Sequence, residues 1–166
     1  MIHIRLATPA DAPDMAEIHM RSWETAYRDI IPAEYIKEKN ATRPALWESL
    51  ITEENTRHHI ILINGQAVGF LCVGPPQDED LDKSFYDLQG LYLHPDYYRQ
   101  GIGTQAMAFA YEKARASAKT NMIVWVLAEN ANAIQFYEAC GFAADGTQQT
   151  REYGREHLII RMRKKL

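Results

Sequence analysis

Two glycines, Gly101 and Gly103, lie in the loop that most constrains how this chain can fold. Residues 88–94, just before the loop, form an apolar run that predicts a buried strand, which Pro95 ends because it cannot donate to a ladder. After the loop, apolar residues recur at helical spacing: Met107, Ala110, Tyr111 and Ala114. The glycines therefore lie at a junction of strand, loop and helix.

This junction is predicted to bind an anion. The first turn of a helix leaves backbone N–H groups without acceptors, and the macrodipole adds roughly half a positive charge there. Glycines have no Cβ, so a phosphate can approach the amides closely, and Arg99 can supply a full positive charge. The expected phosphate-binding residues are Arg99, Gln100, Gly101, Ile102, Gly103 and Thr104.

Other interpretations of the loop are weaker or less specific. A lone Gly-x-Gly also fits a tight turn before a helix. The phosphate loop of nucleotide-hydrolysing enzymes requires a Lys after its last glycine, and none stands there. A dinucleotide fingerprint tolerates Ala106 as its third small residue, but it needs an acidic residue about twenty positions further on, in the region of Lys119. We therefore disfavour both nucleotide-binding alternatives.

The size and charge of the chain exclude several classes of protein. Its 166 residues, 46% of them hydrophobic, predict one domain spanning residues 1–166 with a sizeable core. A net charge of −4 provides no basic field for nucleic acid. The chain has neither the apolar core of a signal peptide nor an apolar run of about 20 residues, so we expect a cytoplasmic protein that does not enter a membrane. Cys72, Cys140 and the six histidines lack metal-ligand spacing, so no metal site is expected.

The rest of the chain alternates between predicted helices and strands. Thr8-Pro9-Ala10-Asp11 predicts a helix start, and the irregular aromatic segment from Trp23 through Tyr27 to Pro32 either lines a cleft or packs in the core. The further elements are a strand at 3–6, a helix through 45–50, a hairpin of strands 59–63 and 66–73, a strand at 122–127 and closing strands at 142–149 and 153–162. This pattern predicts an α+β or mixed α/β fold.

A second segment with ligand-binding potential begins at Asn130, which opens a predicted helix that Gly141 ends. Asn130, Ala133 and Tyr137 share one face of this helix because two turns separate the first and the last. An amide and a phenol can therefore reach toward one ligand.

Two motifs connect the chain to a known family. Leu91-Tyr92-Leu93-His94-Pro95 followed by Gln100-Gly101-Ile102-Gly103 is similar to a pyrophosphate motif usually written Gln/Arg-x-x-Gly-x-Gly/Ala. Asn130-x-x-Ala133-x-x-Phe136-Tyr137-x-x-x-Gly141-Phe142 is similar to the second motif of the same family. On these motifs the chain resembles the GNAT superfamily of acyl-CoA N-acyltransferases over essentially its whole length. One departure is Tyr98, where the family usually has Gln or Arg, with Arg99 one position later.

The resemblance implies a mixed, V-shaped sheet of about seven strands flanked by about four helices. Its central strands separate to admit the pantetheine arm of acetyl-CoA, which the backbone of Leu91 and Leu93 would pair with as an added strand does. Asn130 would hold the pantetheine or pyrophosphate region. Together with loop residues 99–104, the implied cofactor-binding residues are Leu91, Tyr92, Leu93, Asn130, Ala133, Phe136 and Tyr137.

Acetyl transfer to an amine requires a proton acceptor, because alkyl ammonium groups have pKa values of about 10. Asp87 is the candidate base, since family members with an assigned base often carry Glu at this position; a solvated or ion-paired carboxylate is the alternative. Strand alternation would place Asp87 and Gln89 on the same face as Leu91 and Leu93. Tyr137 is the candidate acid for the leaving thiolate, with a structural role as the alternative, and the Leu91 N–H would stabilise the developing oxyanion.

The expected acceptor is a small-molecule amine or a peptide amino group. Trp23, Glu24, Tyr27 and Gln89 are predicted to contact it, although the aromatic residues are equally suited to packing. These features predict an N-acetyltransferase that uses acetyl-CoA in a ternary complex, with a non-catalytic acyl-CoA-binding sensor or scaffold as the alternative. A homodimer through a closing strand is compatible with the pattern.

Overall fold

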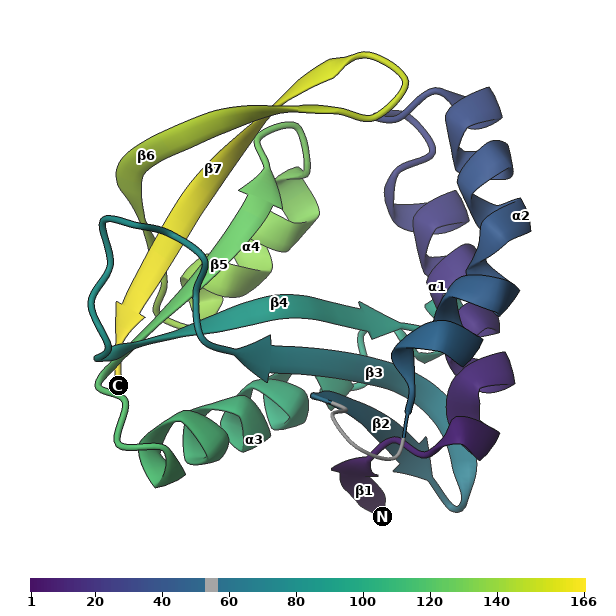
Figure 1. Ribbon diagram of the computed structural model, residues 1–166, viewed down its shortest axis with the longest axis horizontal. Helices are drawn as coiled ribbons and strands as arrows, with labels where there is room; N and C mark the ends of the chain where they lie inside the picture. Colours follow the sequence, from purple (N-terminus) through teal and green to yellow (C-terminus); the bar gives the residue numbers. More distant parts are fainter. Residues whose placement is uncertain (53–56) are drawn as a thin grey trace.

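The computed structural model describes residues 1–52 and 57–166 (Figure 1). The helices are the 3-10 turns η1 (Pro9–Asp11) and η2 (Pro95–Tyr97) and the α-helices α1 (Ala12–Ala26), α2 (Ala33–Leu50), α3 (Ile102–Ala116) and α4 (Ala131–Ala139). The strands are β1 (Ile2–Leu6), β2 (His58–Ile63), β3 (Gln66–Gly74), β4 (Phe85–Leu93), β5 (Asn121–Leu127), β6 (Ala143–Glu152) and β7 (Glu156–Lys165). Within the described residues, seven strands and four α-helices confirm the expected α+β composition.

The strands form one mixed sheet in the order β1-β2-β3-β4-β5-β7-β6. Neighbouring strands run antiparallel except β4 and β5, which are parallel and pair at only three positions, from Phe85 with Asn121 to Asp87 with Ile123. Beyond that point β4 continues to Leu93 and β5 to Leu127, and Figure 1 shows them diverging. The predicted V-shaped separation of the two central strands is confirmed.

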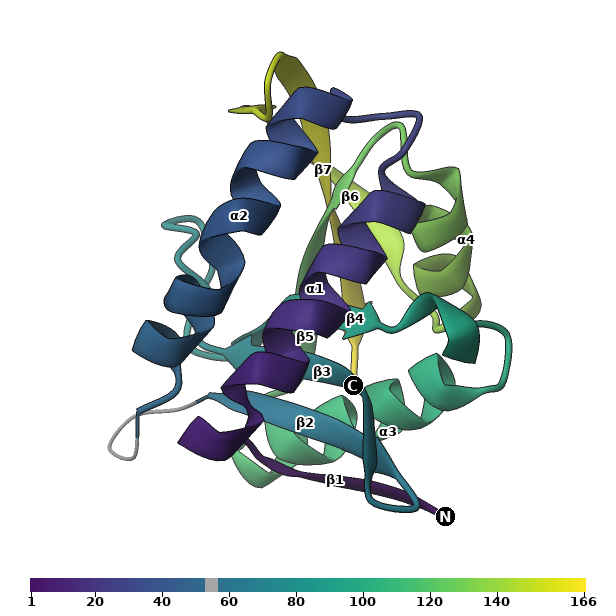
Figure 2. The ribbon, with the colours of Figure 1, turned by 90° about the vertical axis from the view of Figure 1, so that its right-hand side faces the viewer.

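The helices cover the sheet on two faces. Helices α3 and α4 pack on one face, where Met107 and Tyr137 join a core with Val124 of β5 and Leu88 of β4. Helices α1 and α2 lie side by side in front of the other face (Figure 2). We call these the α3/α4 face and the α1/α2 face.

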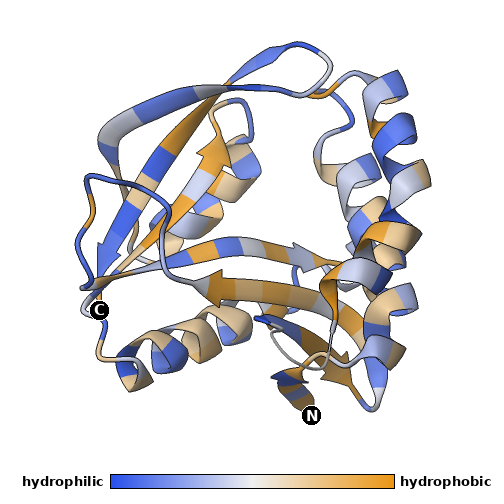
Figure 3. Ribbon diagram, in the orientation of Figure 1, coloured by the Kyte–Doolittle hydropathy of each residue, from blue (hydrophilic) through white to orange (hydrophobic). Residues whose placement is uncertain are grey.

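Hydrophobic residues concentrate on the inner strands β2, β3 and β5, whereas the edge strand β6 and most of α2 are hydrophilic (Figure 3). On β3, seven consecutive residues from Val68 to Gly74 are buried, as expected for a strand covered on both faces. The apolar runs that predicted strands in the sequence therefore correspond to the centre of the sheet.

The predicted helix start at Thr8 is confirmed, although the first turn is the 3-10 segment η1. The Thr8 N–H donates to the Asp11 carboxylate at 2.7 Å, and Arg5 donates to both oxygens of that carboxylate at 2.7 and 2.8 Å. These bonds fix the connection from β1 into α1.

The prediction for the second helix was wrong in extent. Helix α2 begins at Ala33, directly after Pro32, rather than near Ala45, and it includes Pro44 in its interior. A proline inside a helix normally favours a break because it cannot donate to the carbonyl four residues earlier. Tertiary packing of Trp47 and Ile36, both buried, outweighs this local cost.

Candidate active site

The opening between β4 and β5 begins directly after Asp87. This residue pairs with Ile123 in the last of the three β4–β5 pairs. Beyond it the two strands do not pair with each other, over residues 88–93 of β4 and 124–127 of β5. Such an opening exposes backbone groups that an extended ligand can pair with.

Strand β4 contains a β-bulge next to this opening. Cys72 of β3 pairs with Gly90 and Val73 pairs with Leu88, so Gln89 has no opposing residue. A bulge of one residue reverses which face the following side chains point to. The glycine adjacent to the extra residue is consistent with this local irregularity.

The bulge corrects the prediction that Asp87 shares a face with Leu91 and Leu93. Leu88, Leu91 and Leu93 all pack in the core of the α3/α4 face, although Leu88 and Leu91 are three residues apart. Asp87 alternates with its neighbour Leu88 and therefore points to the α1/α2 face. The candidate base thus lies on the opposite side of the sheet from the leucine side chains.

Asp87 lies in an environment that disfavours its charge. It is 9% exposed, and burial raises its pKa to about 7, with the nearby Asp78 carboxylate contributing in the same direction. A carboxyl group with a pKa of about 7 changes its protonation state at neutral pH, as an efficient general base does.

A buried arginine holds Asp78 in place. Arg161 on β7 is 3% exposed and donates to Asp78 at 3.0 Å, to Asp80 at 2.7 and 2.8 Å and to Asp145 at 2.7 Å. Trp125 on β5 donates from Nε1 to Asp78 at 3.2 Å. This network anchors the β3–β4 connection to β5, β6 and β7, beside the base of the opening.

Tyr137, the candidate acid, lies on α4 and points into the core of the α3/α4 face. It is 8% exposed, and burial raises the pKa of its phenol above the usual range, so the hydroxyl stays protonated. Its hydroxyl has no hydrogen-bond partner among the residues described. The phenols of Tyr92 and Tyr27 lie near enough to Tyr137 to interact with it electrostatically. The Tyr137 side chain thus packs on the α3/α4 face, with its phenol within electrostatic range of phenols from the clusters on the α1/α2 face, whereas the Asp87 carboxyl points to the α1/α2 face.

The glycine loop has the geometry expected of a phosphate site. Gly101 is the N-cap residue of α3 with a φ of +75°, and no atom lies within 4 Å of the position a Cβ would take. No side chain caps this helix start, so the first-turn amides are available to a ligand. Arg99, with a φ of +61°, is exposed beside it. These residues fit the pyrophosphate of coenzyme A.

Two predicted cofactor-binding residues also have structural roles. A Cβ on Gly103 would lie 3.1 Å from the Phe136 ring, so this glycine allows α3 to approach α4. The Asn130 Oδ1 accepts a hydrogen bond from the Ala133 N–H at 3.2 Å and caps α4, which leaves its Nδ2 group for a ligand. A direct contact of Asn130 with the cofactor stays a prediction.

The aromatic residues predicted to contact the acceptor lie together on the α1/α2 face. Trp23 packs edge-on against Tyr27, with ring centroids 5.1 Å apart, and against Tyr153 at 6.1 Å. Trp125 and Ile159, on β5 and β7, complete this wall. Tyr153 carried no signal in the sequence, because only the sheet brings the β6–β7 connection next to α1.

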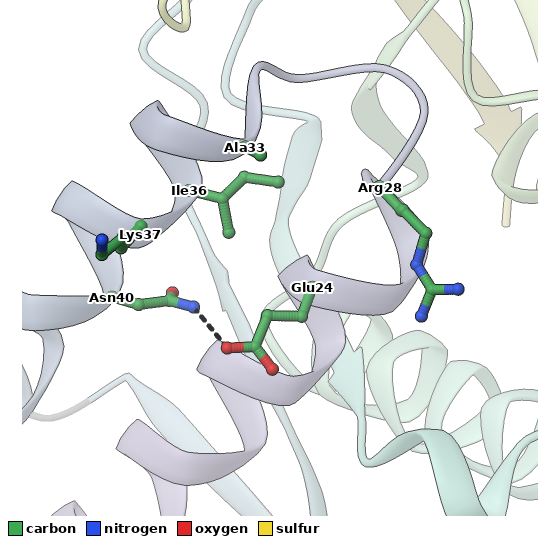
Figure 4. Close-up of a pocket in the computed structure, with 6 residues that line it drawn as sticks. All are labelled: Glu24, Arg28, Ala33, Ile36, Lys37 and Asn40. Carbon is green, nitrogen blue, oxygen red and sulfur yellow. Dashed lines mark hydrogen bonds between the residues drawn. The ribbon is translucent and has the colours of Figure 1, made fainter.

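The two polar residues predicted to contact the acceptor lie elsewhere. Glu24 is exposed in a cavity of about 250 Å³ between α1 and α2, where it accepts a hydrogen bond from Asn40 at 3.2 Å (Figure 4). Gln89 accepts from the Cys72 thiol at 3.2 Å and lines a separate cavity of about 350 Å³ with Leu50. Neither residue joins the aromatic wall formed by Trp23, Tyr27 and Tyr153.

Comparison with known proteins identifies the family. The profile of the Acetyltransferase (GNAT) family matches residues 13–142. The chain belongs to this family. It is 30% identical over 143 residues to YuaI of Bacillus subtilis, an uncharacterized N-acetyltransferase, covering 84% of this chain and 79% of that protein.

Solved structures share the GNAT fold. The PaiA N-acetyltransferase from Thermoplasma acidophilum, crystallised with coenzyme A, has a TM-score of 0.77 at 23% identity and covers 100% of this chain and 99% of its own. YncA of Salmonella typhimurium, a putative acetyltransferase solved with acetyl-CoA, has a TM-score of 0.70 at 20% identity, covering 100% of this chain and 94% of its own.

As a GNAT family member, the protein is an acetyl-CoA-dependent acetyltransferase that acts on amine acceptors. In the part of the chain that the structure describes, no helix is long and apolar enough to cross a bilayer. The same residues contain no group of three or more His, Cys, Asp or Glu side chains arranged to hold a metal ion.

Proposed function

We propose that this GNAT protein transfers acetyl from acetyl-CoA to a primary amine by direct attack in a ternary complex. The observation that carries the proposal is the position of Asp87. This buried carboxyl lies at the point where β4 and β5 separate, and its pKa is about 7. The acceptor would approach from the α1/α2 face, where Asp87 points, and acetyl-CoA from the glycine loop of α3.

Each candidate residue would have a separate task. Acetyl-CoA, when bound, supplies an acetyl thioester. The first-turn amides after Gly101 and the backbone of Leu91 and Leu93 would hold it. Asp87 would accept a proton from the acceptor ammonium, directly or through water, and the ionised form needed for this is substantially populated above about pH 7. Tyr137 would donate its phenolic proton to the leaving sulfur.

Opposite placement of the acid and the base supports this division of labour. Alternation with Leu88, which shares a core with Tyr137, points the Asp87 carboxyl away from the face on which the Tyr137 side chain packs. The amine would add to the thioester carbonyl to form a tetrahedral intermediate, whose collapse breaks the C–S bond and expels the thiolate. One group can therefore accept the amine proton while another protonates the sulfur. A module that only binds acyl-CoA would not require either group.

The test is release of free thiol from acetyl-CoA over a panel of primary amines, with product confirmed by mass spectrometry. We expect amine-dependent thiol release in the parent and a loss of about 10² in rate for Asp87→Asn. The matched control is Asp82→Asn, because the Asp82 carboxylate is exposed and accepts a hydrogen bond from the Ser84 N–H. Tight coenzyme A binding without turnover of any amine would instead support the sensor or scaffold alternative.

A further inference from the structure

A second buried arginine lies behind the aromatic wall. Arg43 on α2 is 5% exposed, and its guanidinium carbon lies 4.3 Å from the centre of the Trp23 ring. Its Nε donates to the Asn40 Oδ1 at 3.1 Å and its Nη1 to the His19 Nδ1 at 3.2 Å. Among the described residues no carboxylate lies within ion-pair distance of this guanidinium, and its buried Nη2 has no hydrogen-bond partner.

Such an arrangement is costly without a further partner. Arginine stays charged in proteins, so Arg43 cannot relieve its burial by losing a proton. Buried charges are normally paired, and each buried unpaired donor adds a desolvation penalty. Burial indeed acts to lower the pKa of Arg43, which means that its surroundings oppose the charge.

Hydrogen bonding defines the protonation state of His19. Its Nδ1 lies 3.2 Å from both the Arg43 Nη1 and the Trp47 Nε1, and each of these groups can only donate a hydrogen bond. Nδ1 is therefore the acceptor, and burial lowers the pKa of this histidine to about 3, so the ring is neutral with its proton on Nε2. The Nε2–H is buried and has no acceptor.

Trp23 adds a third donor. Its Nε1–H is also buried and makes no hydrogen bond of good geometry, although the Tyr92 phenol lies close to it, and its ring contacts His19 with centroids 5.8 Å apart. Arg43, His19 and Trp23 thus form one contiguous cluster, in which two N–H donors have no acceptor and the third, on Trp23, has only the nearby Tyr92 phenol. The complementary group is one with several acceptor atoms and a negative charge, which is a carboxylate.

We infer that Arg43, with His19 and Trp23, forms a subsite that binds a carboxylate of the acceptor. This inference rests on the proposed acetyltransferase function and narrows its substrate to amines that also carry a carboxylate, such as amino acids or short peptides with a free C-terminus.

The acceptor side of the wall is the favoured route to this subsite. The three donor nitrogens are sealed from solvent, so a side chain must move before a ligand reaches them. Arg43, His19 and Trp23 are absent from the lining of the cavity between α1 and α2, which consists of Glu24, Arg28, Ala33, Ile36, Lys37 and Asn40. Trp23 instead covers the guanidinium on the side of Tyr27 and Tyr153, and it is partly exposed. Rotation of the Trp23 ring would uncover Arg43 to an acceptor bound against the wall.

The test compares matched acceptors that differ only in the carboxylate, namely dipeptides with a free C-terminus and the same dipeptides as C-terminal amides. For the parent we expect kcat/KM to be about 10-fold to 100-fold higher for the acids, because hydrogen bonds to charged groups contribute strongly. In Arg43→Met the ratio of acid to amide should fall to about one, and Arg43→Lys should retain part of it. Lys39→Met, which removes an exposed charge from the same helix, should keep the parent ratio.

Two further measurements keep the inference separate from the function it rests on. Thermal unfolding with coenzyme A present should show stronger stabilisation of the parent by the acid than by the amide, whether or not turnover occurs. Arg43→Met should unfold at a temperature no lower than the parent, because it removes a buried charge without a counterion. Equal effects of acid and amide on the parent, or a strongly destabilised Arg43→Met, would overturn the subsite. Failure of every amine to turn over would instead contradict the acetyltransferase proposal.

Discussion

The two faces of the sheet present different chemistry to the opening between β4 and β5. On the α1/α2 face, Asp87 lies near Asp78, which Arg161 and Trp125 hold by hydrogen bonds. On the α3/α4 face, Tyr137 lies among apolar side chains such as Val124 and Phe142. Burial near Asp78 brings the pKa of Asp87 into the neutral range, whereas apolar surroundings raise the pKa of the Tyr137 phenol and keep it protonated. In the mechanism that we propose, proton acceptance belongs to the α1/α2 face and proton donation to the α3/α4 face.

The largest effect expected from this comparison is on the α3/α4 face. Tyr137→Phe removes only the hydroxyl and should lower kcat about 10²-fold while the affinity for coenzyme A stays within about twofold, because general acids typically contribute this much. Single-turnover thiol release measures the chemical step directly. Tyr111→Phe is the matched control, since that phenol lies near the same core and donates to the Cys140 carbonyl at 3.1 Å. Equal rates for the two variants would remove Tyr137 from the mechanism.

Much of the fold could be predicted from the sequence because the signals are local. Apolar runs at 59–63, 66–73 and 122–127 coincide with strands, and the helix that opens at Asn130 was found from its cap. The extent of α2 could not be predicted, since Pro44 is a local signal against a helix that only the packing of Trp47 overcomes.

The faces of the sheet on which the candidate site residues lie could not be predicted from the sequence. Sequence alternation placed Asp87 with Leu91, and a single extra residue at Gln89 reversed this. Arg161 and Asp80, 81 positions apart, carry no mutual signal in the sequence. Arg43 likewise carries no signal in the sequence for its position behind Trp23.

A second prediction concerns the pH dependence of stability, because the pKa values of two buried aspartates are shifted in opposite directions. The pKa of Asp87 is raised to about 7 from its ordinary 3.8. The contribution of this carboxyl to the free energy of unfolding is therefore present below pH 3.8 and is lost as the pH rises through 7. The pKa of Asp11 is lowered to about 2, mainly by the Arg5 hydrogen bonds, so its contribution is present above pH 3.8 and is lost as the pH falls through 2.

Asp87→Asn should therefore stabilise the protein at pH 8 by on the order of 2 kcal/mol, whereas Asp11→Asn should destabilise it. Urea unfolding at pH 5 and pH 8 measures both. The gain from Asp87→Asn should shrink at pH 5, where the parent carboxyl is protonated. A destabilised Asp87→Asn at pH 8 would mean that the ionised carboxylate is stabilised by its surroundings.

A smaller effect is expected at the glycine loop, which serves the cofactor rather than either proton transfer. Gly101→Ala places a methyl group in open space over the α3 amides, and we expect about a tenfold loss of coenzyme A affinity by calorimetry, roughly 1.4 kcal/mol. Gly146→Ala is the matched control, because Gly146 has a φ of +89° and is equally open. Similar backbone strain in both variants, with an affinity loss only in Gly101→Ala, would identify the phosphate site. Equal affinity in the two variants would reject it.

The most direct test of the account is the pH dependence of kcat/KM, which reports the ionisation of groups in the free enzyme, measured from pH 5.5 to 8.5. The parent should show an ascending limb with an apparent pKa of about 7, as the Asp87 carboxyl ionises. Asp87→Asn should lack this limb and run about 10²-fold slower at pH 8, whereas Asp87→Glu should keep a limb at a shifted pH. An unchanged limb and rate in Asp87→Asn would contradict the assignment of proton acceptance to the α1/α2 face.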